Sequence, residues 1–374
     1  MLAAVLILFF ILLVIYSIII LRFAFFLSDI KANGVEAEPH HLFVTLVVPV
    51  RNEESNLPGL FRSLADQDMD TSCYEVVFVN DHSADHTLDL LEEVCRGKQN
   101  FSVLNLDENS SGKKAAIDLA ISISRGTWIL QTDADCTFSP GFIRSHWEKA
   151  AIDKASLITG LVVIEKSNRY WNKIEGLEFL SLSATGLASV LSGNPLMCNG
   201  ANMSYAKSFY LECREELLNI DSPSGDDMFL LLEARKRRKV VAALTNSDSV
   251  VSTIATGSLR AFISQRVRWG SKTGNYSDAA VTLLAALVWL VNLGLSVALI
   301  TGFFLRESFA VFSLALLLKS IADYVLLSRA SRLVSRKDLL YVFPLTALFY
   351  YFYISLSGML SMIGSFSWKG RKYR

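Results

Sequence analysis

Apolar segments that alternate with segments of helical spacing constrain the fold of this chain more than any other feature. The apolar segments are residues 44–50, 75–80, 101–106 and 127–132, and the helical ones are residues 53–64, 84–95 and 113–124. Short, continuously apolar runs are expected for strands that are buried on both faces of a sheet. Strands that alternate with helices at this spacing are typical of a mostly parallel sheet covered by helices. The sequence therefore predicts an α/β fold.

Two aspartates, Asp133 and Asp135, directly follow the fourth predicted strand. Open α/β sheets bind their ligands beyond the carboxyl ends of the strands. Two carboxylates that are one residue apart can hold a hard divalent cation, which in turn binds a diphosphate. The same spacing occurs in residues 66–70, but no predicted strand precedes it, and we interpret that segment as a solvated loop. The strand context thus predicts a metal and diphosphate site at Asp133 and Asp135.

Polar loops also accompany the other predicted strands and helices, at residues 49–54, 80–85 and 109–114. Each loop alone has an ordinary structural explanation, such as a helix cap near Asp81 or a turn at Gly112. A parallel sheet, however, brings all of them to the same edge. Their joint occurrence after successive strands therefore indicates a binding site.

Apolar residues make up 52% of the chain and are concentrated at its two ends. Residues 1–21 are long enough to span a hydrocarbon core of ~30 Å, and they lack the basic start and cleavage site of a signal peptide. Three more spans are predicted at residues 279–305, 309–327 and 339–363. We expect an N-terminal anchor (1–27), one soluble domain (28–278), about three C-terminal transmembrane helices (279–366) and a basic tail (367–374).

Basic residues between positions 329 and 337 predict which side of the membrane the soluble domain faces. Short loops rich in Lys and Arg remain in the cytoplasm. The soluble domain lies two spans earlier and is expected on the same side of a cytoplasmic membrane. The basic tail also favours the cytoplasm, whereas four simple spans would export it. Either residues 339–363, which contain Pro344, do not cross simply, or the tail departs from the rule.

Charge and cysteine content exclude two classes of protein. Lys and Arg number 36, and so do Asp and Glu, which argues against a strongly basic nucleic-acid-binding protein. The five cysteines are irregularly spaced and form no paired CxxC motifs, so neither a disulfide framework nor a zinc site is indicated.

Seven segments of the chain together resemble the family-2 glycosyltransferases, membrane-embedded inverting enzymes whose GT-A fold binds a nucleotide-diphospho-sugar. The segments are VVPVRNEE (47–54), VNDHSADHT (79–87), SGKKAAIDLA (111–120), QTDADC (131–136), CNGANMSY (198–205), SGDDMFLLL (224–232) and QRVRW (265–269). They occur in the order of the family and span nearly the whole predicted soluble domain. Asn80 stands where the family usually has Asp, which weakens any role for Asn80 but leaves Asp81. Residues 225–227 (GDD) stand where Glu-Asp is more frequent, which leaves two candidates for one catalytic base.

The resemblance implies roles in binding a nucleotide-diphospho-sugar, by default a UDP-sugar. The expected contacts with the nucleoside and phosphates are Pro49, Arg51 and Glu53 around the nucleoside, Asp81 at the base edge, and Lys113 near the phosphates. Asp133 is expected near the ribose and the metal, and Asp135 as a ligand of the metal. Mg²⁺ or Mn²⁺ suits such oxygen ligands.

The resemblance also implies an acceptor side. Asp227 aligns with the catalytic base, and Asp226 is the alternative; both open a predicted helix, where an acidic first turn also favours the helix dipole. Residues expected to bind the diphosphate or the acceptor are Gln265, Arg268, Trp269, Gly200 and Asn202.

The residues around these acceptor-side motifs have simpler expected roles. Arg260, Arg266 and Lys272 are expected at anionic lipid headgroups. Residues 170–191 are expected to pack in the core.

We therefore predict an inverting, metal-dependent glycosyltransferase that transfers a sugar to a lipid or lipid-linked acceptor at the membrane. A processive polysaccharide synthase is the alternative, although four spans offer limited material for a polymer channel. A non-catalytic scaffold is disfavoured because Asp81, Asp133, Asp135 and Asp227 are all present. A sugar nucleotidyltransferase would not need QRVRW beside membrane spans.

Overall fold

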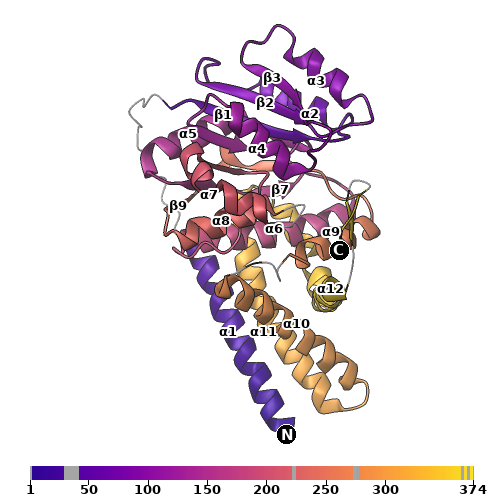
Figure 1. The fold of residues 1–374 in the computed structure, drawn as a ribbon. Helices are drawn as coiled ribbons and strands as arrows, with labels where there is room; N and C mark the ends of the chain where they lie inside the picture. The colour runs from indigo at the N-terminus through magenta and orange to yellow at the C-terminus, as the bar shows by residue number, and fades with distance from the viewer. Residues whose placement is uncertain are drawn as a thin grey trace. The chain divides into compact units, whose positions relative to one another are not determined.

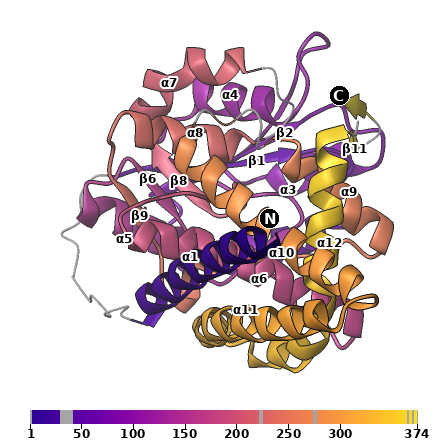
Figure 2. The ribbon, with the colours of Figure 1, turned by 90° about the horizontal axis from the view of Figure 1, so that it is seen from below.

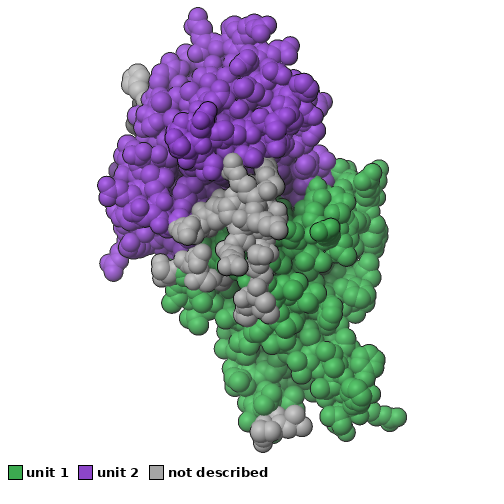
Figure 3. Space-filling model, turned by 45° about the vertical axis from the view of Figure 1, so that its right-hand side comes forward, with its two compact units in different colours: residues 1–29, 166–188, 255–374 green, residues 30–165, 189–254 purple. Residues whose placement is uncertain are grey.

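The computed structural model describes residues 2–28, 42–220, 225–272, 276, 278–363, 366–368 and 371–373. The chain divides into two compact units, each of which is discontinuous in sequence (Figure 3). Unit 1 comprises residues 1–29, 166–188 and 255–374, and unit 2 comprises residues 30–165 and 189–254. The predicted α/β sheet lies in unit 2, and the long apolar helices belong to unit 1.

Unit 2 contains a seven-stranded sheet with the order β3-β2-β1-β4-β8-β6-β9. Its strands are β1 (Val44–Val50), β2 (Tyr74–Asn80), β3 (Phe101–Asn105), β4 (Trp128–Gln131), β6 (Leu157–Thr159), β8 (Met203–Ala206) and β9 (Val241–Ala243). The first four strands are parallel, and β8 runs antiparallel to both β4 and β6. A three-stranded sheet has the order β5-β10-β7, from β5 (Cys136–Phe138), β10 (Val251–Thr253) and β7 (Val162–Ile164).

The helices of unit 2 are α2 (Leu57–Ala65), α3 (Thr87–Cys95), α4 (Lys113–Ile123), α5 (Phe142–Asp153), α7 (Lys207–Asn219) and α8 (Asp226–Lys236), with a 3₁₀ turn η1 (Ser247–Ser249). Two of them begin three or four residues later than predicted. In both cases a non-glycine residue with positive φ stands between the strand and the helix, Asn52 at 52° and His82 at 54°. The residues between these positions and the helices form loops, whose backbone N–H groups donate to side chains of the other segment, as from Glu53 to Thr87 and from Ala84 to Asn52.

The register of the parallel strands, of which Figure 1 labels β1, β2 and β3, places the predicted motifs at one edge of the sheet. Val50 at the end of β1 pairs with Asn80 at the end of β2, which in turn pairs with Asn105 at the end of β3. On the other side of β1, Gln131 at the end of β4 pairs with Val47. The loops that follow these strands therefore start close together, as the sequence predicts.

Unit 1 is mainly helical. Its helices are α1 (Leu2–Ser28), most of α6 (Tyr170–Leu191), α9 (Leu259–Gly270), α10 (Ala279–Gly302), α11 (Arg306–Leu333) and α12 (Phe343–Ile363), with a 3₁₀ segment η3 (Lys337–Val342) and strands β11 (Phe366–Trp368) and β12 (Arg371–Tyr373). Five segments of the described residues are long and apolar enough to cross a membrane: Ala3–Ser28, Tyr170–Leu191, Ala279–Gly302, Arg306–Leu333 and Lys337–Ser361. In α6, 67% of the apolar window is buried, against 17–33% in the other four. Helix α6 is therefore largely covered by protein, as its predicted core role requires.

Polar contacts align α1 with α11. Arg329 near the end of α11 donates to the carbonyl oxygen of Ala24 (2.6 Å) and to Ser28 Oγ (2.9 Å) at the end of α1. Midway along both helices, Tyr16 Oη donates to Asp323 Oδ1 at 2.7 Å. The carboxyl ends of α1 and α11 thus lie on the same side of the helical cluster.

Helix α12 differs in direction from its neighbours within unit 1. Figure 1 looks nearly along the axis of α12, whereas α1, α10 and α11 run lengthwise in the same view, and Figure 2 shows α12 lengthwise. Close contact holds α12 in this position, because a Cβ atom at Gly358 would come within 2.3 Å of the Trp289 ring of α10. Small residues permit such approach between apolar helices.

Candidate active site

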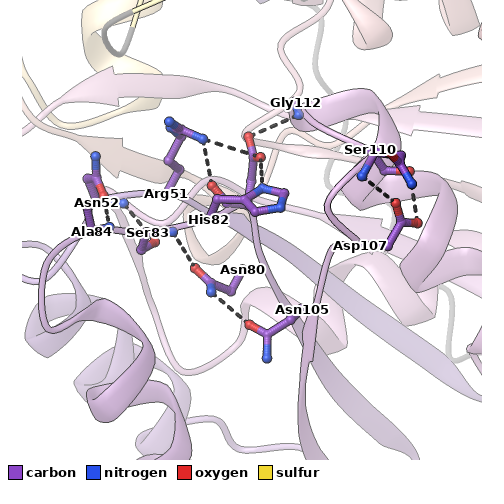
Figure 4. A network of polar contacts seen from close by, with 12 residues as sticks. Arg51, Asn52, Asn80, His82, Ser83, Ala84, Asn105, Asp107, Ser110 and Gly112 are labelled. Carbon is purple, nitrogen blue, oxygen red and sulfur yellow. Dashed lines mark hydrogen bonds and ion pairs between the residues drawn. The ribbon is translucent and has the colours of Figure 1, made fainter.

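Asp81 connects three loops at the carboxyl edge of the sheet. Figure 4 shows its partners Arg51, His82 and Gly112. Its Oδ2 atom accepts a hydrogen bond from the Gly112 backbone N–H at 3.0 Å, and its Oδ1 atom lies 3.1 Å from His82 Nδ1. Arg51 Nη1 donates to the Asp81 carbonyl oxygen at 2.8 Å and lies 3.4 Å from Oδ1. The Asp81 side chain is only 6% exposed. The carboxylate therefore organises the predicted nucleoside loops, and its contact with a base edge stays a prediction.

The loop after β1 is also tied to the loop after β2 by backbone-to-side-chain hydrogen bonds. The Glu53 N–H donates to Thr87 Oγ1 at 2.8 Å, and the Ala84 N–H donates to Asn52 Oδ1 at 2.8 Å. Glu53 itself accepts from Asn56 Nδ2 at 2.6 Å. Pro49 is half-buried near the end of β1. The predicted nucleoside residues Pro49, Arg51 and Glu53 thus share one braced surface.

Asn80, which departs from the family pattern, and its near neighbour His82 have separate effects on the second loop. Asn80 is buried, donates to Asn105 Oδ1 at 2.8 Å and accepts from the Ser83 N–H at 3.2 Å, so it shapes the loop. His82 occupies the left-handed region of backbone space, where glycine has no steric cost. Its hydrogen bond to Asp81 offsets part of that cost.

Lys113 and Asp133 form an ion pair where the phosphates are predicted. Lys113 begins α4, and its Nζ atom lies 2.6 Å from Asp133 Oδ1. Burial alone would lower the pKa of Lys113, but the carboxylates of Asp133, Asp226 and Asp227 outweigh burial and raise it well above the ordinary lysine value. Lys113 is therefore charged at any physiological pH. The sequence predicted both residues separately, but their separation by 20 positions concealed the pairing.

Asp135 lies between the two sheets of unit 2. Its Oδ2 atom accepts from Thr253 Oγ1 at 3.3 Å, and Cys136 Sγ lies 3.6 Å from Oδ1. Within the described part of the chain, no group of three or more His, Cys, Asp or Glu side chains could hold a metal ion. Asp133 and Asp135 alone suit a cation such as Mg²⁺, which commonly takes one or two carboxylates and completes its shell with phosphate oxygens and water. The donor set thus fits a cation that arrives with a diphosphate.

The two candidate bases open helix α8 and have different partners. Asp227 Oδ2 accepts from the Gly200 N–H at 2.9 Å, and its Oδ1 accepts from the Met228 N–H at 2.8 Å. Asp226 Oδ2 instead accepts from Gln131 Nε2 at 2.8 Å. Sequence reasoning missed Gln131, although its place at the end of β4, two residues before Asp133, was a usable signal.

Gly200 brings the phosphate side and the base side together. A Cβ atom at this position would lie 3.0 Å from Gln131 Nε2, 3.3 Å from Lys113 Nζ and 3.3 Å from Asp227 Cβ. A side chain at position 200 would therefore press on all three neighbours at once. The predicted Gly200, Lys113 and Asp227 thus form one site within unit 2.

Asn202 has a different place from the one that its motif suggests. The side chain is fully buried, and its Nδ2 donates to the carbonyl oxygens of Leu161 (2.8 Å) and Ser249 (2.7 Å). Its Oδ1 accepts from His146 Nε2 at 3.0 Å, and burial lowers the pKa of His146 to about 3. Asn202 therefore supports the loop of Gly200 from the core and offers no surface to an acceptor.

Gln265, Arg268 and Trp269 lie together on helix α9 of unit 1 and are half-buried. Arg266, between them, corrects an expectation. It is 6% exposed and pairs with Glu178, so its predicted contact with lipid headgroups is wrong. Lys272, at 8% exposure, is likewise buried, whereas Arg260 is exposed as expected. The position of Arg266 beside a predicted span did not reveal that Glu178, 88 residues earlier in the chain, is its buried partner.

The sheet order and the carboxylates that follow β4 agree with the predicted GT-A fold. The mannosyltransferase PcManGT from Pyrobaculum calidifontis, solved in complex with GDP-Man and Mn²⁺, aligns with 96% of this chain and 99% of its own. The TM-score is 0.59 at 15% sequence identity, a likeness that shows the fold. Residues 45–212 match the sequence family described as Glycosyl transferase family 2. Residues 45–212 are thus similar to a family-2 glycosyltransferase domain, and the structural likeness confirms the predicted GT-A fold.

Curated relatives match parts of the chain. The poly(ribitol-phosphate) beta-glucosyltransferase of Bacillus spizizenii is 35% identical over 25% of this chain and 14% of its own length. An N-acetylglucosaminyltransferase of Rhizobium meliloti is 27% identical over 69% and 62%, respectively. The undecaprenyl-phosphate 4-deoxy-4-formamido-L-arabinose transferase of Pseudomonas aeruginosa is 29% identical over 35% and 38%. The chain thus spans less than two thirds of the length of each of these relatives.

Proposed function

We propose that this glycosyltransferase is inverting and metal-dependent, and that it moves a sugar from a nucleotide-diphospho-sugar to a lipid or lipid-linked acceptor at a membrane. The convergence of Lys113, Asp133 and Asp227 around Gly200 carries the proposal. The reaction needs positive charge beside the leaving diphosphate and a carboxylate that receives the acceptor proton. Both occur in this one site.

The braced loops after β1 and β2 would hold the nucleoside of the donor. Arg51, Glu53 and Asp81 lie there, and the loops need no rearrangement of their mutual hydrogen bonds to present a fixed surface. A UDP-sugar is the default donor for the family, while the structural neighbour from Pyrobaculum calidifontis carries GDP-Man. The nucleotide is therefore the first variable for an experiment.

In the chemical step, an acceptor hydroxyl attacks the anomeric carbon from the face opposite the diphosphate. The new C–O bond forms while the bond from that carbon to the diphosphate oxygen breaks, and the hydroxyl proton passes to Asp227. Lys113 stays charged and stabilises the departing diphosphate, because its pKa is raised by three neighbouring carboxylates despite burial. Asp226, held by Gln131, supports Asp227. When bound at Asp133 and Asp135, a divalent cation would supply further charge stabilisation.

The contact between Arg329 and the end of α1 supports a cytoplasmic location for the catalytic unit. The chain enters unit 2 after α1, at the same end of the helical cluster as the basic segment 329–337. Basic segments of this kind remain in the cytoplasm. A reporter fused after Arg336 and a cysteine label in unit 2 should both report the cytoplasmic side. Labelling of unit 2 from outside would refute the proposal, because nucleotide sugars would then be inaccessible.

The direction of α12 supports one of the two explanations for the basic tail. A helix that lies across α1, α10 and α11 would not carry the chain over the membrane in a simple span (Figure 2). The tail could then stay on the cytoplasmic side, in agreement with its charge. If α12 does not span the membrane, one chain has fewer spanning helices from which to build a polymer channel, which disfavours a processive synthase. The product length with purified enzyme distinguishes single transfer from polymerisation.

A donor screen tests the proposed function directly. The purified full chain is incubated with a panel of nucleotide sugars, and release of nucleoside diphosphate is measured with and without EDTA. We expect turnover of one donor class that stops with EDTA and returns with Mg²⁺ or Mn²⁺. Turnover that resists the chelator would exclude the metal, and retention of the anomeric configuration in the product would exclude inversion.

A further inference from the structure

Arg266 is the most completely enclosed charged side chain of helix α9. Its Nε atom donates to both carboxylate oxygens of Glu178, at 3.0 and 3.1 Å, and its Nη2 atom also donates to Glu178. The side chains of both partners are only 4% exposed. The guanidinium group is planar and offers donors in a fixed fork, so this arrangement fixes its orientation.

Arg266 also contacts two of the three motif residues on its own helix. Its Nη1 atom donates to Gln265 Oε1. The guanidinium carbon lies 4.4 Å from the ring centroid of Trp269 and 4.4 Å from that of Phe262. The cation thus lies close to two aromatic rings, one of which belongs to the motif. Any change in the position of Arg266 would therefore change Gln265 and Trp269 together.

Glu178 and the rings around Arg266 connect three helices of unit 1. Glu178 belongs to α6 and accepts a hydrogen bond from Tyr353 Oη of α12 at 3.4 Å. The Tyr353 ring packs on Phe262 of α9, with centroids 5.2 Å apart. On the other side, Trp269 packs against Phe179 of α6 at 6.0 Å. The orientation of the motif therefore depends on α6 and α12 through one buried ion pair.

Stability alone does not explain such a pair. Removing two charges from water is costly, and apolar residues of similar volume often stabilise a protein equally well or better. An arginine that is held by a carboxylate and lies close to two aromatic rings is, however, well suited to fix the geometry of its neighbours. The Arg266–Glu178 pair would therefore serve to keep Gln265 and Trp269 in one fixed arrangement.

We infer that Arg266 is a positioning residue, held by Glu178 and Tyr353, that keeps Gln265 and Trp269 in the arrangement required for sugar transfer. The inference rests on the proposed function of the motif on α9. Arg266 needs no contact with donor or acceptor for this role. Its importance would come from the neighbours that it orients, because misplacement of catalytic contacts by about 1 Å can reduce a rate about 100-fold.

Paired substitutions separate positioning from simple stabilisation. Replacement of both partners by apolar residues, Arg266→Met with Glu178→Met, removes the buried charges together and should preserve the fold. We expect wild-type thermal stability and nucleotide affinity, but turnover that is lower by about 100-fold. Wild-type turnover in this stable double variant would overturn the inference.

A second buried pair in unit 1 provides the matched control. Lys319 and Asp323 of α11 lie 2.5 Å apart, with side chains 6% and 20% exposed, and neither contacts the α9 motif through a hydrogen bond among the described residues. Lys319→Met with Asp323→Leu should leave turnover unchanged. An equal loss of turnover in this control would overturn the inference, because any buried charge pair of the unit would then have the same effect.

The conservative variant Arg266→Lys keeps the experiment decisive if a double variant fails to fold. Lysine can pair with Glu178 but cannot also hold Gln265 beside two rings. We expect a folded protein with reduced kcat and unchanged nucleotide affinity, and unchanged kcat would refute the role. If the wild-type chain transfers no sugar from any donor, the proposed function itself fails, which this series reports separately.

Discussion

Two ion pairs of the molecule, Lys113–Asp133 and Arg266–Glu178, combine the same charges in different environments. The first is partly open, with side chains 17% and 37% exposed, whereas both side chains of the second are 4% exposed. Lysine is a flexible point charge, and arginine is a planar group with a fixed fork of donors. An open lysine pair can exchange its partner for a phosphate, while an enclosed arginine pair keeps its neighbours in place. One pair is thus suited to binding and the other to positioning.

Removal of the Asp135 carboxylate, which follows β4 two residues after Asp133 of the open pair, should have the largest effect on turnover. Asp135→Asn would take away one of two predicted metal ligands, and we expect turnover to fall by about 1000-fold or more, because a bound cation contributes several kcal/mol to charge stabilisation. Steady-state release of nucleoside diphosphate measures the effect. Asp70→Asn, an exposed aspartate with the same Asp-x-Asp spacing, is the control and should behave as wild type. Near wild-type turnover of Asp135→Asn in EDTA would remove the metal from the proposal.

The base beside the open pair should come next. Asp227→Asn is nearly isosteric, and the loss of general-base assistance should reduce transfer by about 10²–10⁴-fold while nucleotide affinity stays close to normal. Asp226→Asn should reduce the transfer rate less, because Asp226 accepts a hydrogen bond from Gln131 and is proposed only to support Asp227. Nucleotide binding and transfer rate are measured for both variants. An active Asp227→Asn with an inactive Asp226→Asn would reverse the assignment.

Lys113→Met should sharpen the contrast between the open and the enclosed pair. The change leaves Asp133 without its cationic partner and the diphosphate without a nearby ammonium group. We expect donor affinity and turnover each to fall by about tenfold or more, as for the loss of a charge-assisted hydrogen bond. Arg266→Lys, in contrast, should change turnover alone. Isothermal calorimetry with the nucleoside diphosphate distinguishes the two, and equal effects on affinity would contradict the division of roles.

The last prediction concerns stability and a neutral buried residue behind the site. Burial lowers the pKa of His146 to about 3, so the folded protein binds fewer protons than the unfolded chain below about pH 6.5. Stability contributed by neutral His146 is therefore present above pH 6.5 and is lost progressively as pH falls toward 3. At pH 5 the loss should be about 2 kcal/mol.

Unfolding at pH 7 and pH 5, with the variant His146→Gln, measures this dependence. The variant should lose that part of the pH dependence, whereas His86→Gln, at an exposed histidine, should retain it. A His146→Gln variant with an unchanged pH profile would contradict the assignment.

The sequence located the four parallel strands within one or two residues. The apolar runs of β1, β2 and β4 are almost entirely buried, whereas β3, at the edge of the sheet, is half-buried. Two helix starts were less accurate, because residues 53–56 and 84–86 lie in loops held by hydrogen bonds to side chains of another segment. The short strands β6, β7, β9 and β10 have only three residues each and no periodic pattern long enough to recognise. The local sequence pattern thus predicted the parallel strands and the sheet edge at which they end. The short strands and the loop conformations could not be predicted in this way, because they depend on tertiary contacts.

The same limit applies to the site. Asp133, Lys113 and Asp227 were found through their motifs, yet their meeting at Gly200 depends on segments far apart in sequence. Asn202 and Arg266 were misplaced because a polar side chain in a motif is expected at a surface, whereas each has buried partners supplied by distant elements. Burial of polar residues is not encoded in local spacing.

Gly200 has a consequence for how this enzyme can change over evolution or by engineering. A Cβ atom at this position would lie 3.0 Å from the amide nitrogen of Gln131 and 3.3 Å from both the ammonium group of Lys113 and the Cβ atom of Asp227, so a larger residue would have to displace these groups. A mutation at position 200 would therefore act on the proposed donor side and the proposed acceptor side together. Acceptor preference and donor preference could not drift independently, and a new acceptor would require compensating changes at Lys113 or Gln131.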